Sequence, residues 1–391
     1  MSVNDSECLY YSHPGLDESE ATLVELRAEG RELLLDRTLF FPEGGGQPCD
    51  LGLIEGIALD SVTESEGRIV HRLATALDAA PGDRLRLRLD RARRADHSEQ
   101  HSAQHLLSGF LFRNHGIPTL SFHLGVELST IDVDASDFSE SLADELDAEV
   151  NEAIARATPF VLHLCPPEDI AALPLRKSPP AEESILRIWE IEGLDFSPCG
   201  GTHVASAAEL RLFKINRVER YKGKTRLHFS AGTRAVENYR RLHRSAGTAA
   251  RILSSPPEAL AEGAERCVKK SREAAARADR LLGILLGRLV ESAPPGKPVA
   301  LDLSGIGSEG IEEGMRAIRA RERTGVVSLA ETPTVGVVGK PGVSLPVDLL
   351  SAAKARGGKG GGAPGSLRVA FADAVSAREF ALLAIKSIEN C

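Results

Sequence analysis

The residues best placed to do chemistry form two short pairs, His101 with His105 and Cys199 with His203. Three residues separate the members of each pair, and two histidines at that spacing on a helix point the same way. Imidazole nitrogen and thiolate sulfur are preferred ligands of Zn²⁺. We therefore expect two segments that lie far apart in the sequence to hold one zinc ion between them. His97, one helical turn before His101, could replace one of the four, but we expect it to lie behind the ligands or to face solvent.

The histidine-rich segment carries no metalloprotease signature. Residues 97–101 read His-Ser-Glu-Gln-His, so the glutamate is one place away from both the HExxH and the HxxEH pattern. Four protein ligands normally close a structural zinc site, whereas a zinc hydrolase keeps one position open for water or substrate. Whether all four ligands bind at once stays open at this point.

A glycine-rich loop with the sequence PEGGGQP spans residues 42–48. Its three glycines either allow a tight turn between strands or expose backbone N–H groups to a phosphate or carbonyl of a ligand, with Gln47 at the margin. A second glycine cluster fills residues 357–362. Neither cluster is a P-loop, because no Gly-Lys-Ser or Gly-Lys-Thr follows at the required spacing.

The most basic part of this acidic chain lies between residues 207 and 244. The whole protein has a formal net charge of −9, yet this segment is rich in lysine and arginine, including Lys222, Lys224 and Arg226. A basic segment is most often a solvated face. Aromatic residues are interleaved with the charges here, and this combination favours contact with the phosphate backbone of a nucleic acid.

The hydrophobic pattern predicts an α+β fold that begins with two different parts. Alternating apolar segments predict a β-barrel-like subdomain with the glycine-rich loop in residues 1–95. A helix capped by Asp96 then begins a zinc-containing α/β core in residues 96–245. The two ligand pairs both fall within this second part.

The last two parts follow a change of pattern. Residues 246–295 predict a long helical connector, because apolar and small residues from Leu260 to Leu285 recur at alternating spacings of four and three. This seam suits a homodimer contact or the inner face of an intramolecular helical hairpin. Resumed β/α alternation predicts a final α/β domain in residues 296–391, which is a second candidate for the dimer contact.

Composition indicates the environment of the protein. Its six cysteines lack the close spacings of a disulfide framework. Residues 1–30 are acidic and mixed rather than apolar, and no apolar run reaches the roughly 18 residues of a membrane span. We therefore expect a reduced, cytoplasmic protein with no membrane segment, in which clustered cysteine and histidine bind a metal.

Four motifs, taken in order, resemble the editing domain of alanyl-tRNA synthetases: PEGGGQP, DHSEQHSAQHLLSG, SFHLG followed by TIDVD, and SPCGGTHV. Over about residues 20–245 they resemble most closely the free-standing alanyl-tRNA editing proteins of the AlaX type. The C-terminal part, with GGKGGGAP, resembles the DHHA1 domain of alanyl-tRNA synthetases and of long AlaX proteins. DHH phosphoesterases also carry DHHA1 domains, but this chain lacks their aspartate-rich metal motifs.

The resemblance implies a hydrolase that removes serine or glycine from mischarged alanine tRNA. The implied Zn²⁺ ligands are His101, His105, Cys199 and His203. Gln47 would line the amino-acid pocket, and Ser102, where the family often has threonine, would bond the substrate hydroxyl or nearby backbone. Contacts to substrate or tRNA are expected from Gly44, Gly45, Gly46, Lys222, Lys224, Arg226, Gly358, Lys359 and Gly360.

Two other functions stay open. The zinc could be purely structural, in a tRNA-binding module without hydrolytic activity. Alternatively, the site could hydrolyse another acyl ester or amide, which activity independent of tRNA would reveal. One departure from the family pattern is neutral between these functions: Gly201 occupies a position of the CGGTH motif whose residue varies in the family.

Overall fold

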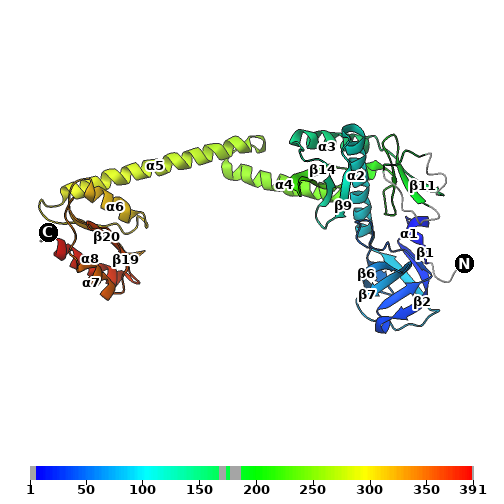
Figure 1. Ribbon diagram of the computed structural model, residues 1–391, viewed down its shortest axis with the longest axis horizontal. Helices are drawn as coiled ribbons and strands as arrows, with labels where there is room; N and C mark the ends of the chain where they lie inside the picture. The colour runs from blue at the N-terminus through cyan, green and yellow to red at the C-terminus, as the bar shows by residue number, and fades with distance from the viewer. Residues whose placement is uncertain (1–5, 167–172, 177–185, 390–391) are drawn as a thin grey trace. The chain divides into compact units, whose positions relative to one another are not determined.

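The computed structural model describes residues 6–166, 173–176 and 186–389. Residues 1–5 and 390–391, which belong to the expected first and last domains, lie outside this range. The chain forms two compact units, residues 1–246 and residues 247–391. Each unit combines helices and strands, in agreement with the predicted α+β class (Figure 1).

Six strands of the first unit close into a ring in the order β2-β3-β7-β6-β5-β8. The alternating sequence of strand β8 fits this ring, because Leu85, Leu87 and Leu89 are buried while the arginines between them are exposed. This ring is the feature that the alternating segments anticipated as a barrel-like subdomain. Its strands are β2 (Glu18–Arg27), β3 (Glu32–Leu35), β5 (Gly52–Ile54), β6 (Ile57–Ser65), β7 (Arg68–Leu73) and β8 (Arg84–Leu89).

A short N-terminal segment packs on the ring. Strand β1 (Glu7–Cys8) pairs in parallel with β4 (Arg37–Thr38), and helix α1 (Leu9–Ser12) follows it. Tyr10 of α1 belongs to the apolar core of the ring. The next residue, Tyr11, donates a hydrogen bond of 2.7 Å to the carbonyl oxygen of Gly200. The N-terminal segment therefore reaches the CGGTH motif.

Helix α2 (Arg91–His115) carries the first ligand pair. Asp90 caps it through its side chain, and Gly116 ends it in the left-handed conformation with φ 65°. The prediction that Asp96 is the N-cap was wrong, because the cap is Asp90, nearly two turns earlier, in an arginine-rich stretch without apolar periodicity. Asp96 instead accepts hydrogen bonds from Arg234 at 2.7 and 2.6 Å.

The rest of the first unit consists of two antiparallel sheets and helix α3, and α2 contacts both sheets. The four-stranded sheet has the order β14-β15-β10-β9, and the three-stranded sheet has the order β11-β12-β13. Leu106 and Leu107 of α2 lie fully buried in the core that these elements share. The elements are β9 (Thr119–Leu124), β10 (Ser129–Val133), α3 (Glu140–Ala155), β11 (Phe160–Cys165), β12 (Leu186–Ile191), β13 (Asp195–Pro198), β14 (Phe213–Tyr221) and β15 (Lys224–Ala231), with 3-10 turns η1 (Ala28–Gly30) and η3 (Ala207–Leu210).

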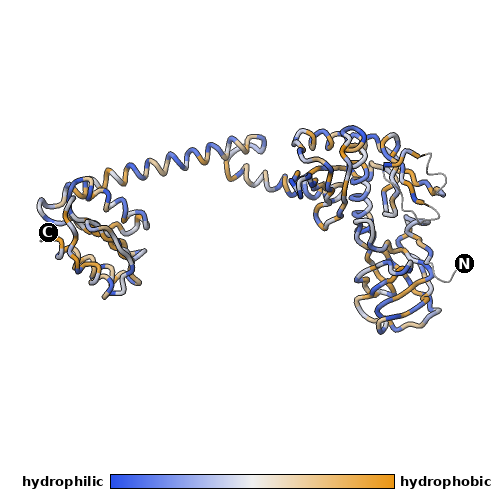
Figure 2. The backbone as a smooth tube through the Cα atoms, viewed as in Figure 1, coloured by the Kyte–Doolittle hydropathy of each residue, from blue (hydrophilic) through white to orange (hydrophobic). Residues whose placement is uncertain are grey.

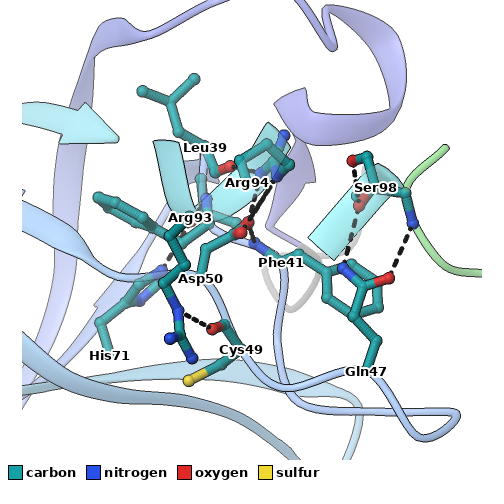
Figure 3. A network of polar contacts seen from close by, with 12 residues as sticks. Leu39, Phe41, Gln47, Cys49, Asp50, His71, Arg93, Arg94 and Ser98 are labelled. Carbon is teal, nitrogen blue, oxygen red and sulfur yellow. Dashed lines mark hydrogen bonds and ion pairs between the residues drawn. The ribbon is translucent and has the colours of Figure 1, made fainter. Parts of the chain in front are cut away.

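A buried ion pair joins the ring to helix α2 (Figure 3). The side chains of Arg94 and Asp50 are only 9% and 1% exposed. Arg94 donates to the Asp50 carboxylate at 2.9 Å and to the carbonyl oxygen of Leu39 at 2.8 Å. Asp50 also accepts a hydrogen bond of 2.7 Å from the amide of Phe41. Both charges are thus matched and hydrogen-bonded, which fixes the loop of residues 39–50 against the helix.

Helix α4 (Gly232–Leu253) runs from the first unit into the second, where η4 (Pro257–Ala259) and helix α5 (Leu260–Ser292) follow. The predicted long helix is confirmed. Its 4-3-4-3 seam from Ala264 to Leu285 is exposed, and Figure 2 colours much of α5 as hydrophilic or intermediate. The buried residues of α5 are Gly263, Leu286, Gly287 and Val290. The seam is therefore uncovered along most of its length.

A five-stranded sheet with the order β16-β17-β18-β20-β19 completes the second unit. The glycine cluster of residues 357–362 has a packing role in this unit. An added Cβ at Gly358 would lie 2.6 Å from the side chain of Val369, and an added Cβ at Gly360 would overlap the backbone of Arg368. Lys359 between them is exposed. The elements are β16 (Val299–Asp302), α6 (Gly310–Arg319), β17 (Gly325–Leu329), β18 (Thr334–Val338), α7 (Leu349–Ala355), β19 (Lys359–Gly361), β20 (Ser366–Ala370) and α8 (Ala374–Ile388).

Membrane insertion was not expected from the composition. Among the helices that the structure describes, none has both the length and the apolar composition needed to cross a bilayer.

The buried ion pair predicts a large stability effect. Replacing Asp50 with alanine leaves the Arg94 charge buried without a partner, so the free energy of unfolding should fall by about 3–5 kcal/mol. Urea denaturation followed by circular dichroism measures this loss. The matched control is Glu20→Ala, which breaks the exposed Arg84–Glu20 pair and should cost at most about 1 kcal/mol. Equal losses for the two variants would contradict the structural role given to the buried pair.

Candidate metal centre

Four potential ligands meet between helix α2 and the loop that follows β13. They are His101, His105, Cys199 and His203, and one ligand atom from each lies within 4.8 Å of the others. The Sγ atom of Cys199 is 3.4 Å from Nε2 of His101 and 3.4 Å from Nε2 of His203. Ligand atoms about 2.0–2.3 Å from a tetrahedral ion are themselves roughly 3.5 Å apart, so this spacing fits a metal ion. The prediction that the two distant pairs come together is confirmed.

The protonation of His203 also suits a metal. Its burial lowers its pKa well below the ordinary 6.5, and charge on the neighbouring His101 and His105 lowers the pKa further. His203 is therefore a neutral imidazole at pH 7, with a lone pair available for coordination. The rings lie close, with centroids 4.4 Å apart for His101 and His203 and 4.7 Å apart for His105 and His203.

Gln47 of the glycine-rich loop orients the first ligand. Its Oε1 atom lies 2.9 Å from Nδ1 of His101 and accepts a hydrogen bond of 3.2 Å from the amide of Thr202. Its Nε2 atom donates to the hydroxyl of Thr202 at 3.0 Å. With Nδ1 protonated toward Gln47, His101 directs its unprotonated Nε2 at Cys199. Gln47 is fully buried, and its amide is occupied by these three contacts.

Ser102 of helix α2 contacts His203, the potential ligand histidine of the CGGTH motif. Its Oγ atom is 3.1 Å from Nδ1 of His203 and accepts a hydrogen bond of 3.1 Å from the amide of Val204. The residue is fully buried. Both residues expected to act on substrate are therefore in contact with ligand histidines. Sequence reasoning missed the third member of this network, Thr202, although it lies inside the CGGTH motif itself.

The absence of a side chain at Gly201 allows the two segments of the centre to approach each other. An added Cβ would overlap the ring of His101 and lie 2.9 Å from Oε1 of Gln47. The residue therefore lets the CGGTH loop approach helix α2 closely enough for Cys199 to reach His101. The sequence showed this glycine only as a variable position of the motif.

The glycine-rich loop forms a tight turn beside the centre. Gly44 and Gln47 exchange backbone hydrogen bonds of 3.1 and 2.9 Å, while Gly45 and Gly46 have φ values of 60° and 85°. Positive φ at two successive positions is the requirement that glycine meets in such turns. The turn itself is exposed, whereas Gln47 points inward. The interpretation of the loop as a tight turn is confirmed. The interpretation that its glycine amides bind a ligand stays a prediction.

Most of the basic segment is neutralised by acidic neighbours. Arg226 donates to both carboxylate oxygens of Asp132 at 2.6 and 2.9 Å, and Lys224 pairs with Asp134. Lys222 occupies the exposed turn between β14 and β15 and forms no ion pair within the described part of the chain. Of these three expected tRNA contacts, Lys222 offers the least neutralised charge.

His97 does not join the ligand group. It is 3% exposed, so the expectation that it faces solvent was wrong. Burial lowers its pKa to about 4, and its buried Nδ1 atom has no hydrogen-bond partner among the residues described. It lies one turn before His101 on helix α2, and the alternative that it packs behind the ligands stays a prediction.

A cavity of about 280 Å³ lies beside the centre and has His203, Gly201 and Thr202 in its wall. Aromatic and basic side chains from α1 and the three-stranded sheet, including Tyr11, Arg187 and Trp189, complete the lining. A cavity that borders metal ligands is where a substrate would be positioned for reaction at the ion.

Comparison with known proteins finds a family model that matches part of the first unit. A family model described as the threonyl and alanyl tRNA synthetase second additional domain matches residues 186–228. The matched range begins at β12, contains Cys199 and His203, and ends in β15. It therefore includes one of the two ligand pairs.

Three relatives extend the comparison. The alanyl-tRNA editing protein AlaX-L of Pyrococcus horikoshii is 34% identical over 241 residues, which make up 59% of each chain. The alanyl-tRNA editing protein Aarsd1 of Danio rerio is 36% identical over 211 residues, or 53% of this chain and 51% of the relative. The alanine–tRNA ligase of Pyrococcus abyssi is 29% identical over 290 residues, or 71% of this chain and 31% of the ligase. This chain thus spans about half to three fifths of the editing proteins, and its resemblance to the AlaX type is confirmed.

Gly201 allows a direct test of the centre. In Gly201→Ala the new methyl group displaces His101, so metal affinity should fall by about 10–100-fold, as for loss of a residue that orients a ligand. Competition with a chromophoric chelator measures this affinity. Gly44→Ala is the matched control, because no atom lies within 4 Å of its added Cβ, and it should bind metal like the wild type. Wild-type affinity in Gly201→Ala would show that the four residues do not share one ion.

Proposed function

We propose that this relative of the AlaX-type alanyl-tRNA editing proteins is a hydrolase that deacylates alanine tRNA mischarged with serine or glycine. One observation carries the proposal: four potential metal ligands converge beside a cavity in a chain that is similar to alanyl-tRNA editing proteins. The substrate is an activated ester on the terminal ribose, so the site needs a positioned water and stabilisation of the oxyanion.

Zinc is the metal that the donor set favours. Three imidazoles and one thiolate are typical tetrahedral ligands of Zn²⁺, and softer or oxygen-preferring ions suit other sets. His101, His105, Cys199 and His203 would hold the ion, which when bound supplies a Lewis acid next to the ester carbonyl. Cytoplasmic location, where thiols stay reduced and tRNA is charged, fits this centre.

The chain's own residues position the reactants. Gln47 holds His101 in the tautomer that directs Nε2 to the centre, and Ser102 holds the His203 ring in place through its contact with Nδ1. We therefore assign them as positioning residues rather than as a nucleophile or base. The exposed amides of the turn at Gly45 and Gly46 are donors for the polar groups of the substrate.

The acceptor end and the body of the tRNA would meet different parts of the chain. Lys222 at its exposed turn is a contact for the phosphate backbone from the first unit. In the second unit, which we interpret as a connector and a DHHA1-like domain, exposed Lys359 on β19 is a contact for the body of the tRNA. The uncovered seam of α5 supports a homodimer formed through this helix.

The deacylation assay tests the proposed function. Purified protein is incubated with alanine tRNA charged with serine, glycine or alanine, and loss of the amino acid is followed. Seryl-tRNA should be hydrolysed at least about tenfold faster than alanyl-tRNA, because a site that bonds the serine hydroxyl is left with unpaired groups by alanine. The double variant His101→Ala, His105→Ala should lose zinc and more than about 100-fold of the rate.

Other outcomes separate the alternatives. Zinc-bound protein that leaves all three charged tRNAs intact would support a structural zinc in a tRNA-binding module. Hydrolysis of a simple amino-acid ester as fast as of charged tRNA would support a different acyl ester as the substrate. Retained zinc in the double variant would overturn the ligand assignment.

Removing the second unit tests its role in binding. A chain that ends at Ala246 should keep its hydrolytic rate at saturating substrate, because all four ligands lie in the first unit. Its affinity for alanine tRNA, measured by filter binding, should fall at least about tenfold through loss of a second contact. Sedimentation should show a monomer where the full chain forms a dimer. Unchanged tRNA affinity would show that the second unit does not anchor the tRNA.

A further inference from the structure

The cavity beside the metal centre carries two polar groups that the proposed chemistry leaves without a role. Arg187 and Trp189 are two residues apart on β12, so their side chains share one face of the strand. Both line the cavity, and the ring of Trp189 lies 4.7 Å from the ring of the ligand His203. A molecule in the cavity would therefore touch Arg187 and Trp189 while it borders the centre.

Both residues present a buried donor without an acceptor. The Nε atom of Arg187 and the Nε1 atom of Trp189 are inaccessible to solvent and have no hydrogen-bond partner among the described residues. Leaving a buried donor unpaired costs free energy, and such groups in a folded protein call for an explanation. Because these two atoms are themselves inaccessible, a ligand in the cavity would instead bond to the terminal nitrogens of the Arg187 guanidinium, which have no hydrogen-bond partner among the described residues. The guanidinium of Arg187 is already held in place, 3.7 Å from the centroid of the Tyr11 ring.

Charge decides which end of the substrate fits. The cavity lining contains Arg187 and Arg94 but no carboxylate among the described residues. Arg94 is matched by Asp50, whereas Arg187 forms no ion pair within the described part of the chain. An unmatched guanidinium attracts a phosphate and repels the ammonium group of an amino acid. The wall also has polar side chains at Ser98, Thr202 and His203. Its apolar and aromatic part, including Phe160 and Leu162, suits a nucleobase.

We propose that this cavity binds the terminal nucleotide of the acceptor strand, with its phosphate on Arg187 and its base among the aromatic side chains. The inference rests on the proposed function, because an ester that reacts at the centre has its ribose attached next to it. The nucleotide must then occupy space that borders the ligands, and the cavity beside His203 is such a space. The ring of Trp189 adds an aromatic surface to the space that this nucleotide would occupy.

The chain offers a direct probe of occupancy, because Trp189 is its single tryptophan. Adenosine 5′-monophosphate, which has the base, ribose and phosphate of the terminal nucleotide, should change the tryptophan fluorescence on titration. Adenosine without the phosphate should bind at least about tenfold more weakly, since it lacks the charge-assisted hydrogen bonds to Arg187. Free serine should leave the fluorescence unchanged at the same concentrations.

Arg187→Gln separates the phosphate contact from a general loss of structure. This variant should bind the nucleotide and adenosine equally, and it should raise KM for seryl-tRNA about tenfold or more with little change in kcat and none in zinc content. Arg86→Gln is the matched control, because Arg86 also lies on a strand of the first unit but is 80% exposed, and it should behave as the wild type.

The two proposals fail in different ways. An active deacylase whose fluorescence ignores the nucleotide, or whose Arg187→Gln variant keeps its KM, has its terminal nucleotide elsewhere, and the inference is wrong while the function stands. A protein that binds the nucleotide with the expected preference but deacylates none of the charged tRNAs keeps the cavity assignment and loses the proposed function. Equal affinity of the wild type for adenosine and its phosphate overturns the assignment of Arg187.

Discussion

The arrangement of the metal centre depends on a buried ion pair that lies outside it. Arg94 and Asp50 hold the loop of residues 39–50 onto helix α2, in the part of the helix that precedes His101. The same loop carries Gln47 (Figure 3). The ion pair therefore also helps to set how far the Gln47 amide lies from the ring of His101. The orientation of the His101 ring therefore depends on how the ring of strands packs on helix α2.

The region around the centre separates neutral from charged functions. Burial keeps His203 uncharged, which suits coordination, and the hydrogen bonds of Gln47 and Ser102 are all between neutral groups. Positive charge in the cavity wall lies at Arg187 and at Arg94, which is paired with Asp50. An ester substrate has the same division, since its reacting carbonyl is neutral and its nearest formal negative charge is on the phosphate. The centre and the adjoining cavity would therefore suit two neighbouring parts of one molecule, the ester carbonyl and the phosphate.

The ligands and the long helix α5 could be predicted because each depends on a local pattern. Residue type and a spacing of four identified His101 with His105, and alternating spacings identified the helix. The start of α2 at Asp90 rather than Asp96 was not visible, because the first turn shows no apolar periodicity. Such a turn is held by tertiary contacts, including that of Arg94, which a single segment does not display.

Long-range partners explain what else remained hidden. The basic character of the β14–β15 hairpin suggested open phosphate contacts, but the carboxylates that match Lys224 and Arg226 come from another strand and the residues after it. The packing of Gly201 against His101 likewise joins segments about a hundred residues apart in sequence. Sequence reasoning could name these residues, but only the fold assigns them their neighbours.

The separation of the two ligand pairs also has a consequence for synthesis of the protein. Because translation proceeds from the N-terminus, the ring and helix α2 leave the ribosome well before Cys199 and His203. The early chain has only two imidazoles to offer, which form half of a tetrahedral shell. An ion held by all four residues would be enclosed only after the loop that follows β13 has docked on helix α2, so full coordination would come late, after this long-range docking.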